Sequence, residues 1–135
     1  YEALLKQYPA DIVCLGIGEN GHIAFNDPHV ADFKDPQAVK IVDLDQACRQ
    51  QQVNDGCFQS INEVPTHAST LAIPALLSAD YMYCIVPGES KATAVYHTLY
   101  GEISITCPAS VLRTKDNVTL YLDANSASLI ETKTF

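Results

Sequence analysis

The sequence predicts an α/β fold, a three-layer sandwich built around a mainly parallel, Rossmann-like sheet. Segments with the pattern of strands alternate with segments that have the pattern of helices along the 135 residues. The strand-like segments are mostly continuous apolar runs, which is typical of parallel strands that are covered on both faces. This alternation favours a parallel sheet whose strands are joined by helices, and the length fits one domain.

Short apolar runs bounded by turn residues mark the expected strands. Residues 11–15 are apolar after their first position, and residues 81–86 (YMYCIV) end at a Pro-Gly pair. Residues 39–44 (VKIVDL) and 118–122 (VTLYL) have the same character. We therefore expect four strands, the first of which is followed at its carboxyl end by a polar loop.

Capping residues that precede an apolar stripe mark the expected helices. Pro9 ends the first helix, and Pro74 is expected to shorten or kink the third. Further helical turns are expected at residues 108–112 and after Asp123 or Asn125. The expected helices cover residues 4–8, 45–52, 68–77 and 90–99, and the last three have Asp45, Thr66 and Ser90 as N-terminal caps.

The composition is that of a globular protein, with 47% hydrophobic and 18% charged residues. The formal net charge of −8 argues against nucleic acid or an anionic membrane as partner, because both require a basic surface. A small phosphorylated ligand remains compatible, since it needs only one or two cations and some backbone N–H groups. No apolar run reaches the length of a membrane span, so we expect a cytoplasmic protein.

Five cysteines occur, and none of them forms a CxxC pair. Cys14 and Cys84 lie within apolar strand-like runs, so we expect both thiols to be buried and reduced. Buried, reduced thiols agree with a reducing compartment. The sequence also lacks the HxxxH or clustered Cys/His spacing of a zinc site, so no metal is expected.

Residues 16–21 read GIGENG, which matches the GxGxxG fingerprint of dinucleotide-binding proteins. Asp43 even lies about 20 residues further on, where that fingerprint places its acidic residue. The fingerprint requires that a helix follow the third glycine. Residues 22–28 (HIAFNDP) instead contain a proline, two turn-favouring residues and no helical stripe. We therefore reject a dinucleotide site.

The loop over residues 16–28 has the groups of a proton-transfer site. His22 is its only side chain that titrates near neutral pH. Asp27 could accept a hydrogen bond from one imidazole nitrogen and leave the other free for proton transfer. Asn20, which can donate and accept, could orient the same ring or a substrate hydroxyl. Because ligands bind at the carboxyl ends of parallel strands, this loop is the candidate site.

The residues GIGENGHIAFNDP closely resemble the signature of the glucosamine-6-phosphate deaminase/isomerase family. The similarity continues through residues 64–68 (VPTHA) and 87–92 (PGESKA). The related phosphogluconolactonases share the fold and a similar Asp-Gly-His, but usually continue through Ser-Leu-Phe-Pro. The run from Ala24 to Pro28 is closer to the deaminases.

The resemblance implies that glucosamine 6-phosphate is opened, isomerised and deaminated to fructose 6-phosphate and ammonia, without metal or organic cofactor. It implies that His22 handles the ring-oxygen proton. Asp27 matches an acidic residue that orients the histidine and is commonly Glu, so its reach is one methylene shorter. Asn20 matches a position that is Asp or Asn in the family, and with Asn the site carries one negative charge fewer.

The same resemblance assigns substrate contacts. Lys91, at a helix start after a strand, matches the phosphate-binding lysine of the family, and Gly16 and Ala24 are further candidate contacts in the loop. The family also uses an arginine from the region of Arg49 on the phosphate, but the local sequence matches poorly. A surface ion pair is an equal alternative for Arg49.

The base that removes the C2 proton in this family is an aspartate of the N-terminal half, and no aspartate here has the required context. We therefore expect residues 1–135 to be the C-terminal portion of a single deaminase/isomerase domain, incomplete on its own. Two alternatives stay open: a 6-phosphogluconolactonase-like hydrolase on the same fold, and a non-catalytic sugar-phosphate-sensing domain. The partner expected in each case is a small phosphorylated sugar, an amino sugar for the deaminase, and a homo-oligomer is compatible with the sequence.

Overall fold

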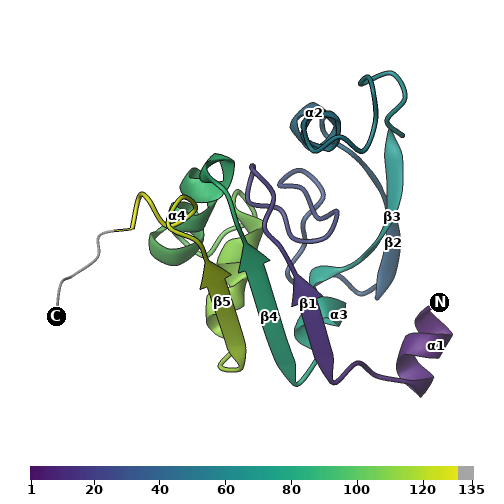
Figure 1. Ribbon diagram of the computed structural model, residues 1–135. Helices are drawn as coiled ribbons and strands as arrows, with labels where there is room; N and C mark the ends of the chain where they lie inside the picture. The colour runs from purple at the N-terminus through teal and green to yellow at the C-terminus, as the bar shows by residue number, and fades with distance from the viewer. Residues whose placement is uncertain (131–135) are drawn as a thin grey trace, which may run out of the picture.

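Three parallel strands form the central sheet of the computed structural model, which describes residues 1–130 (Figure 1). The strands are β1 (Ile12–Leu15), β4 (Tyr81–Val86) and β5 (Val118–Leu122), in the order β1-β4-β5. Leu15 pairs with Cys84, and Val86 pairs with Leu122. The predicted α/β class with a parallel sheet is confirmed. All three carboxyl ends lie at one edge of the sheet, where the loop after β1 begins.

One face of this sheet carries the main hydrophobic core. Met82, Cys84 and Val86 alternate along β4 and are almost fully buried. They pack with apolar side chains of three helical segments that connect the strands. These segments are α3 (Ile73–Leu77), α4 (Ala92–Tyr100) and η2 (Pro108–Thr114), a 3₁₀ helix.

The opposite face of the sheet exposes apolar side chains. Ile12 is 54% exposed, Tyr81 51% and Tyr121 53%. Cys14 is also exposed, so the expectation that its thiol is buried was wrong. The physical reason is the strand period of two: residues 12 and 14 share one face and residues 13 and 15 the other, and only the second face is packed.

A second, antiparallel sheet consists of β2 (Val39–Asp43) and β3 (His67–Leu71). The expectation of a helix over residues 68–77 was therefore half wrong, because its first half is β3. Helix α3 begins only after Ala72, with Pro74 in its first turn. Proline fits that position because an N–H there has no partner within the helix, so Pro74 starts the helix instead of kinking it.

The remaining helices are α1 (Glu2–Gln7) and α2 (Gln46–Asn54). Asp45 caps α2 as predicted, since its side chain accepts a hydrogen bond from the backbone N–H of Cys48 at 2.6 Å. Ser90 is not a cap: a 3₁₀ turn, η1 (Glu89–Lys91), precedes α4. At the end of β5, Asp123 accepts from the Ser126 N–H at 2.7 Å, as expected for a capped turn.

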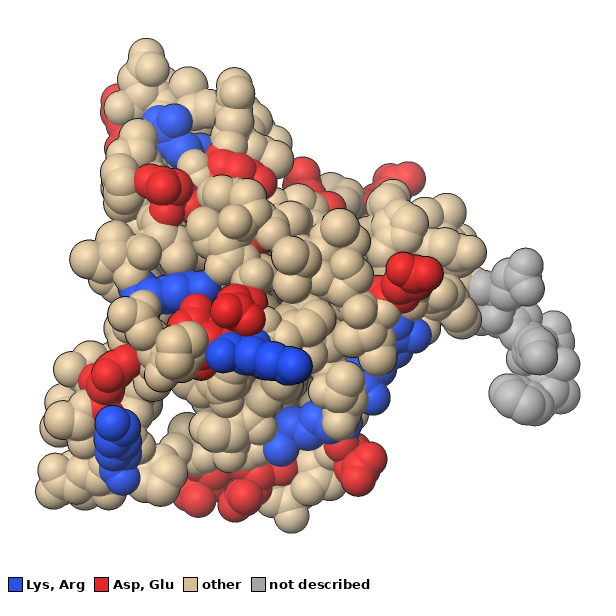
Figure 2. Space-filling model, turned by 180° about the vertical axis from the view of Figure 1, so that it is seen from behind, with Lys and Arg blue, Asp and Glu red and all other residues tan. Residues whose placement is uncertain are grey.

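Within residues 1–130, none of the helices has the length and apolar character needed to cross a bilayer. The rear face of the molecule, shown in Figure 2, carries Lys and Arg side chains interspersed with Asp and Glu side chains. Among the described residues, Lys40 forms an ion pair with Asp35 at 2.8 Å.

Candidate active site

The loop after β1 folds back on itself so that the ring of His22 lies against Gly18. The Gly18 N–H donates to the His22 carbonyl at 2.9 Å, and the Gly21 N–H donates to the Gly18 carbonyl at 2.9 Å. A Cβ atom at position 18 would lie 2.1 Å from Cε1 of His22. Gly21 has a φ of +83°, which favours glycine. Gly18 therefore leaves room for the imidazole, and Gly21 allows the turn that precedes it and its close contact with Cys107. In the described structure, no helix follows the third glycine before β2, whereas a nucleotide-binding loop would require one.

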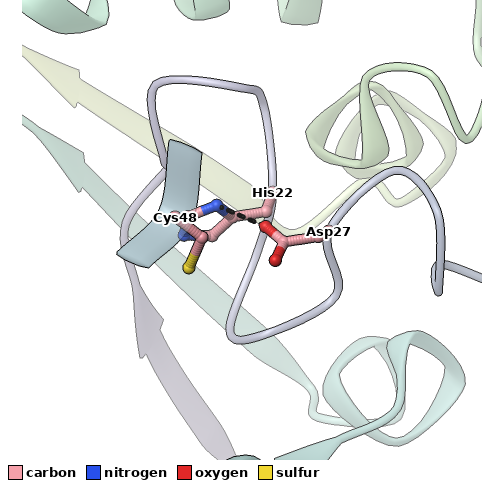
Figure 3. A group of neighbouring side chains, drawn as sticks. All are labelled: His22, Asp27 and Cys48. Carbon is pink, nitrogen blue, oxygen red and sulfur yellow. Dashed lines mark ion pairs between the residues drawn. The ribbon is translucent and has the colours of Figure 1, made fainter. Parts of the chain in front are cut away.

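His22, Asp27 and Asn20 lie together, as the sequence predicted. Nδ1 of His22 is 3.0 Å from Oδ1 of Asp27, the contact drawn as a dashed line in Figure 3. The same nitrogen is 2.7 Å from Oδ1 of Asn20. Asp27 is fully buried, and the side chain of His22 is 12% exposed. The aspartate thus reaches the ring despite being shorter than glutamate.

The amide of Asn20 fixes which histidine nitrogen carries the proton. Its Nδ2 donates to Oδ1 of Asp27 and to Oδ2 of Asp45, each at 3.0 Å. Because the NH₂ group faces two carboxylates, Oδ1 of Asn20 must face His22 as an acceptor. Nδ1 of His22 then meets only acceptors and must carry a hydrogen. In the neutral ring, Nε2 is left with a free lone pair.

Asp27 is held in its charged form. Burial would raise the pKa of its carboxyl, but hydrogen bonds from His22 and Asn20, the charge of His22 and a backbone N–H of Asp45 outweigh burial, so that its pKa lies below the usual value. A carboxylate that stays ionised beside His22 stabilises the imidazolium that forms when the ring takes up a proton.

His22 opens onto a cavity of about 460 Å³ at the carboxyl edge of the sheet. Four predicted residues line it: Gly16, His22, Ala24 and Lys91. Ala24 has a φ of 49°, in the left-handed region that non-glycine residues rarely adopt. It lies in the tight turn in which the Asn26 N–H donates to the Ile23 carbonyl at 3.1 Å. Asn20 and Asp27 do not line this cavity, and they contact His22 at Nδ1 instead.

Arg49 does not line this cavity. Its Nη2 donates to the carbonyls of Ile61 and Val64, at 2.7 and 3.0 Å, so the guanidinium fixes the chain that follows α2. Gln51 and Asp55 of the α2 region line the cavity instead. These two residues were not predicted as part of the site. Asp55 is the C-cap of α2, and its Oδ2 accepts a hydrogen bond from Nε2 of Gln51 at 3.3 Å.

Two groups of side chains have the spacing of metal ligands among the described residues, but their donors are engaged. The first is His22, Asp27 and Cys48 (Figure 3). Burial, followed by the charges of Asp27 and Asp45, raises the pKa of the Cys48 thiol to about 12. The second is Asp27, His29 and Asp45. Both carboxylates there already accept hydrogen bonds from Asn20.

The chain matches the family model described as glucosamine-6-phosphate isomerases/6-phosphogluconolactonase over residues 1–121. A curated glucosamine-6-phosphate deaminase of Listeria innocua is 38% identical over 130 residues, which are 96% of this chain and 53% of that protein. A glucosamine-6-phosphate deaminase of Bacillus cereus is 41% identical over 129 residues, 96% of this chain and 47% of that protein. The chain thus spans about half the length of the curated relatives it matches.

Two solved structures of related proteins resemble this chain in fold. A monomeric glucosamine-6-phosphate deaminase superposes with a TM-score of 0.88 at 40% identity, over 96% of this chain and 52% of that one. A 6-phosphogluconolactonase from Trypanosoma cruzi gives a TM-score of 0.64 at 21% identity, over 91% of this chain and 42% of that one, and shows the fold alone. On the family match and the motif around His22, the chain belongs to the glucosamine-6-phosphate isomerase/6-phosphogluconolactonase family.

Proposed function

We propose that this chain supplies the ring-opening part of a glucosamine-6-phosphate deaminase, with His22 as the proton-transfer group. The observation that carries the proposal is the imidazole whose Nδ1 is held by Asp27 and Asn20 while its ring lines the same cavity as Lys91. The names of the relatives at 38% and 41% identity support the choice of substrate. Because the chain spans about half of those proteins, the activity of the whole protein is part of the proposal.

Ring opening needs one group that moves a proton between two sugar oxygens. Nε2 of His22 accepts the proton of the anomeric hydroxyl, the bond between C1 and the ring oxygen breaks, and the C1 carbonyl forms. The imidazolium then gives the proton to the ring oxygen, so no net charge is created. Asp27 stabilises the imidazolium in between. General acid–base catalysis of this kind contributes about 10²–10⁴-fold.

The charges of the cavity favour an amino sugar phosphate over a lactone. Lys91 provides a cation for the phosphate, and Asp55 provides an anion on the same cavity. Glucosamine 6-phosphate carries both a phosphate and an amine, whereas a phosphogluconolactone carries a phosphate only. One cation and one anion therefore match the first substrate better.

Two assays test the proposal on the protein. Ammonia release from glucosamine 6-phosphate supports the deaminase, and acid release from 6-phosphogluconolactone would support the related hydrolase. The ring-opening step is measured separately by magnetisation exchange between the α and β anomers of glucosamine 6-phosphate. The protein should accelerate this exchange, and His22→Gln should remove the acceleration.

His67→Gln is the matched control, because His67 is 61% exposed on β3 and pairs with Asp43 at 2.7 Å, outside the cavity. It should leave the exchange rate unchanged. If His22→Gln retained full acceleration, the role of His22 would be refuted. Binding of the sugar phosphate without exchange and without ammonia release would support the sensing domain instead.

A further inference from the structure

Asp45 has more contacts with the candidate site than a helix cap requires. Its Oδ1 accepts the Cys48 N–H at 2.6 Å, which is the cap itself. Its Oδ2 accepts Nδ2 of Asn20 at 3.0 Å, and its backbone N–H donates to Oδ2 of Asp27 at 3.3 Å. The start of α2 is thus joined to both residues that hold His22.

We propose that Asp45 is a positioning residue that acts on His22 through Asn20. The amide of Asn20 has one donor side and one acceptor side, and its orientation decides what Nδ1 of His22 meets. Two carboxylates, Asp27 and Asp45, hold the donor side away from the ring. Asp45 therefore supports the tautomer with hydrogen on Nδ1, which the direct contact of Asp27 with Nδ1 at 3.0 Å also favours, and Nε2 keeps its lone pair.

The geometry of the side chains shows what Asp45 adds to Asp27. Oδ1 of Asp27 lies 3.0 Å from Nδ2 of Asn20 and 3.0 Å from Nδ1 of His22, so a single oxygen serves two donors. A flipped Asn20 would direct its NH₂ group at Nδ1 of the ring and favour hydrogen on Nε2 instead. The carboxylate of Asp45 adds to the cost of that flip because it would face the amide oxygen, and the flip would also lose the hydrogen bond that the His22 backbone N–H donates to Oδ1 of Asn20 at 3.1 Å.

The experiment reads the tautomer of His22 from its ¹⁵N chemical shifts in the full chain. In the unmodified protein, the neutral ring should show a protonated Nδ1 and an unprotonated Nε2. Asp45→Asn and Asp45→Ser both retain a good helix cap but lose the acceptor for Asn20. Both variants should increase the fraction of the tautomer with hydrogen on Nε2. Asp45→Asn should increase this fraction more than Asp45→Ser, because the new amide can place its own NH₂ group against Nδ2 of Asn20.

Two controls separate this role from charge and from stability. Asp43→Asn removes the same charge from a side chain that is 71% exposed and paired with His67, and should leave the His22 signals unchanged. Asn20→Ala provides the test of the route: if Asp45 acts through Asn20, Asp45→Asn should change the tautomer no further in that background. A further change of the His22 tautomer in the Asn20→Ala background would show that Asp45 does not act through Asn20.

An unchanged tautomer in both Asp45→Asn and Asp45→Ser would refute the positioning role and leave Asp45 as a cap only. The inference rests on the proposed proton transfer by His22, but the tautomer is measured without turnover. A protein with the expected tautomer and no effect on sugar anomers would refute the proposed function while the positioning role stands.

Discussion

Replacing Gly18 with alanine tests whether the glycine loop exists to place His22. A Cβ at position 18 would lie 2.1 Å from Cε1, 2.3 Å from Nδ1 and 2.4 Å from Nε2 of His22, so it meets the whole ring. Ordinary contact begins at 3.4 Å. The ring must therefore retreat by about 1.3 Å, or the loop must open.

The cost follows from the two contacts of Nδ1. A displacement of about 1 Å would stretch the contacts of 2.7 Å to Asn20 and 3.0 Å to Asp27 beyond hydrogen-bond range. Asp27 is fully buried, so the loss of one donor to its charged carboxylate costs about 2 kcal/mol of stability. We therefore expect the free energy of unfolding to fall by about 2 kcal/mol in Gly18→Ala.

The assay is chemical denaturation together with the ¹⁵N signals of His22. Gly16→Ala is the matched control, because a Cβ there would meet only the Ile85 carbonyl at 3.4 Å, an ordinary contact. It should leave the His22 signals in place. In a His22→Ala background, Gly18→Ala should cost less than about 0.5 kcal/mol, because the ring it displaces is gone. A cost of about 2 kcal/mol in that background would refute the reasoning.

Three further predictions follow from single groups. Lys91→Ala should weaken binding of glucosamine 6-phosphate about tenfold in a titration, whereas Lys34→Ala, on an exposed loop, should not. The pKa of Asp27 is held below its ordinary value of 3.8, so the stability that its charge provides is present above pH 3.8 and is lost as the pH falls through the lowered pKa. Asp27→Asn should therefore flatten the acid unfolding transition. Iodoacetamide should modify the exposed Cys14 well before Cys84, whose pKa burial raises to about 12.

Much of the fold could be predicted because its determinants are local. The apolar runs at 12–15, 81–86 and 118–122 are strands in the structure, and Asp45 caps its helix. The segment at 67–71 was misassigned because its strand character depends on pairing with β2. That pairing joins residues distant in sequence, for example Val39 with Leu71, and helical spacing within the segment cannot reveal it.

The candidate site divides in the same way. His22 and Asp27 could be paired from the sequence because they lie five residues apart in one loop. The role of Asp45 could not, since it reaches Asn20 across 25 positions and is recognisable in the sequence only as a cap. Arg49 was a candidate on resemblance alone. Its guanidinium instead donates to two backbone carbonyls, whose positions cannot be inferred from the sequence.

Asp27 links the chemistry of the site to its architecture, which affects how variants must be interpreted. One oxygen contacts His22 and Asn20, while the other accepts the backbone N–H of Asp45 at the start of α2. A substitution of Asp27 therefore changes the imidazole and the anchoring of α2 together, and α2 carries Gln51 to the cavity. Loss of activity in an Asp27 variant would not identify which change caused it. Substituting His22 removes the group proposed to transfer the proton, while the hydrogen bonds from the Asn20 amide to Asp27 and Asp45 remain. A test of the proposed chemistry therefore has to rest on His22.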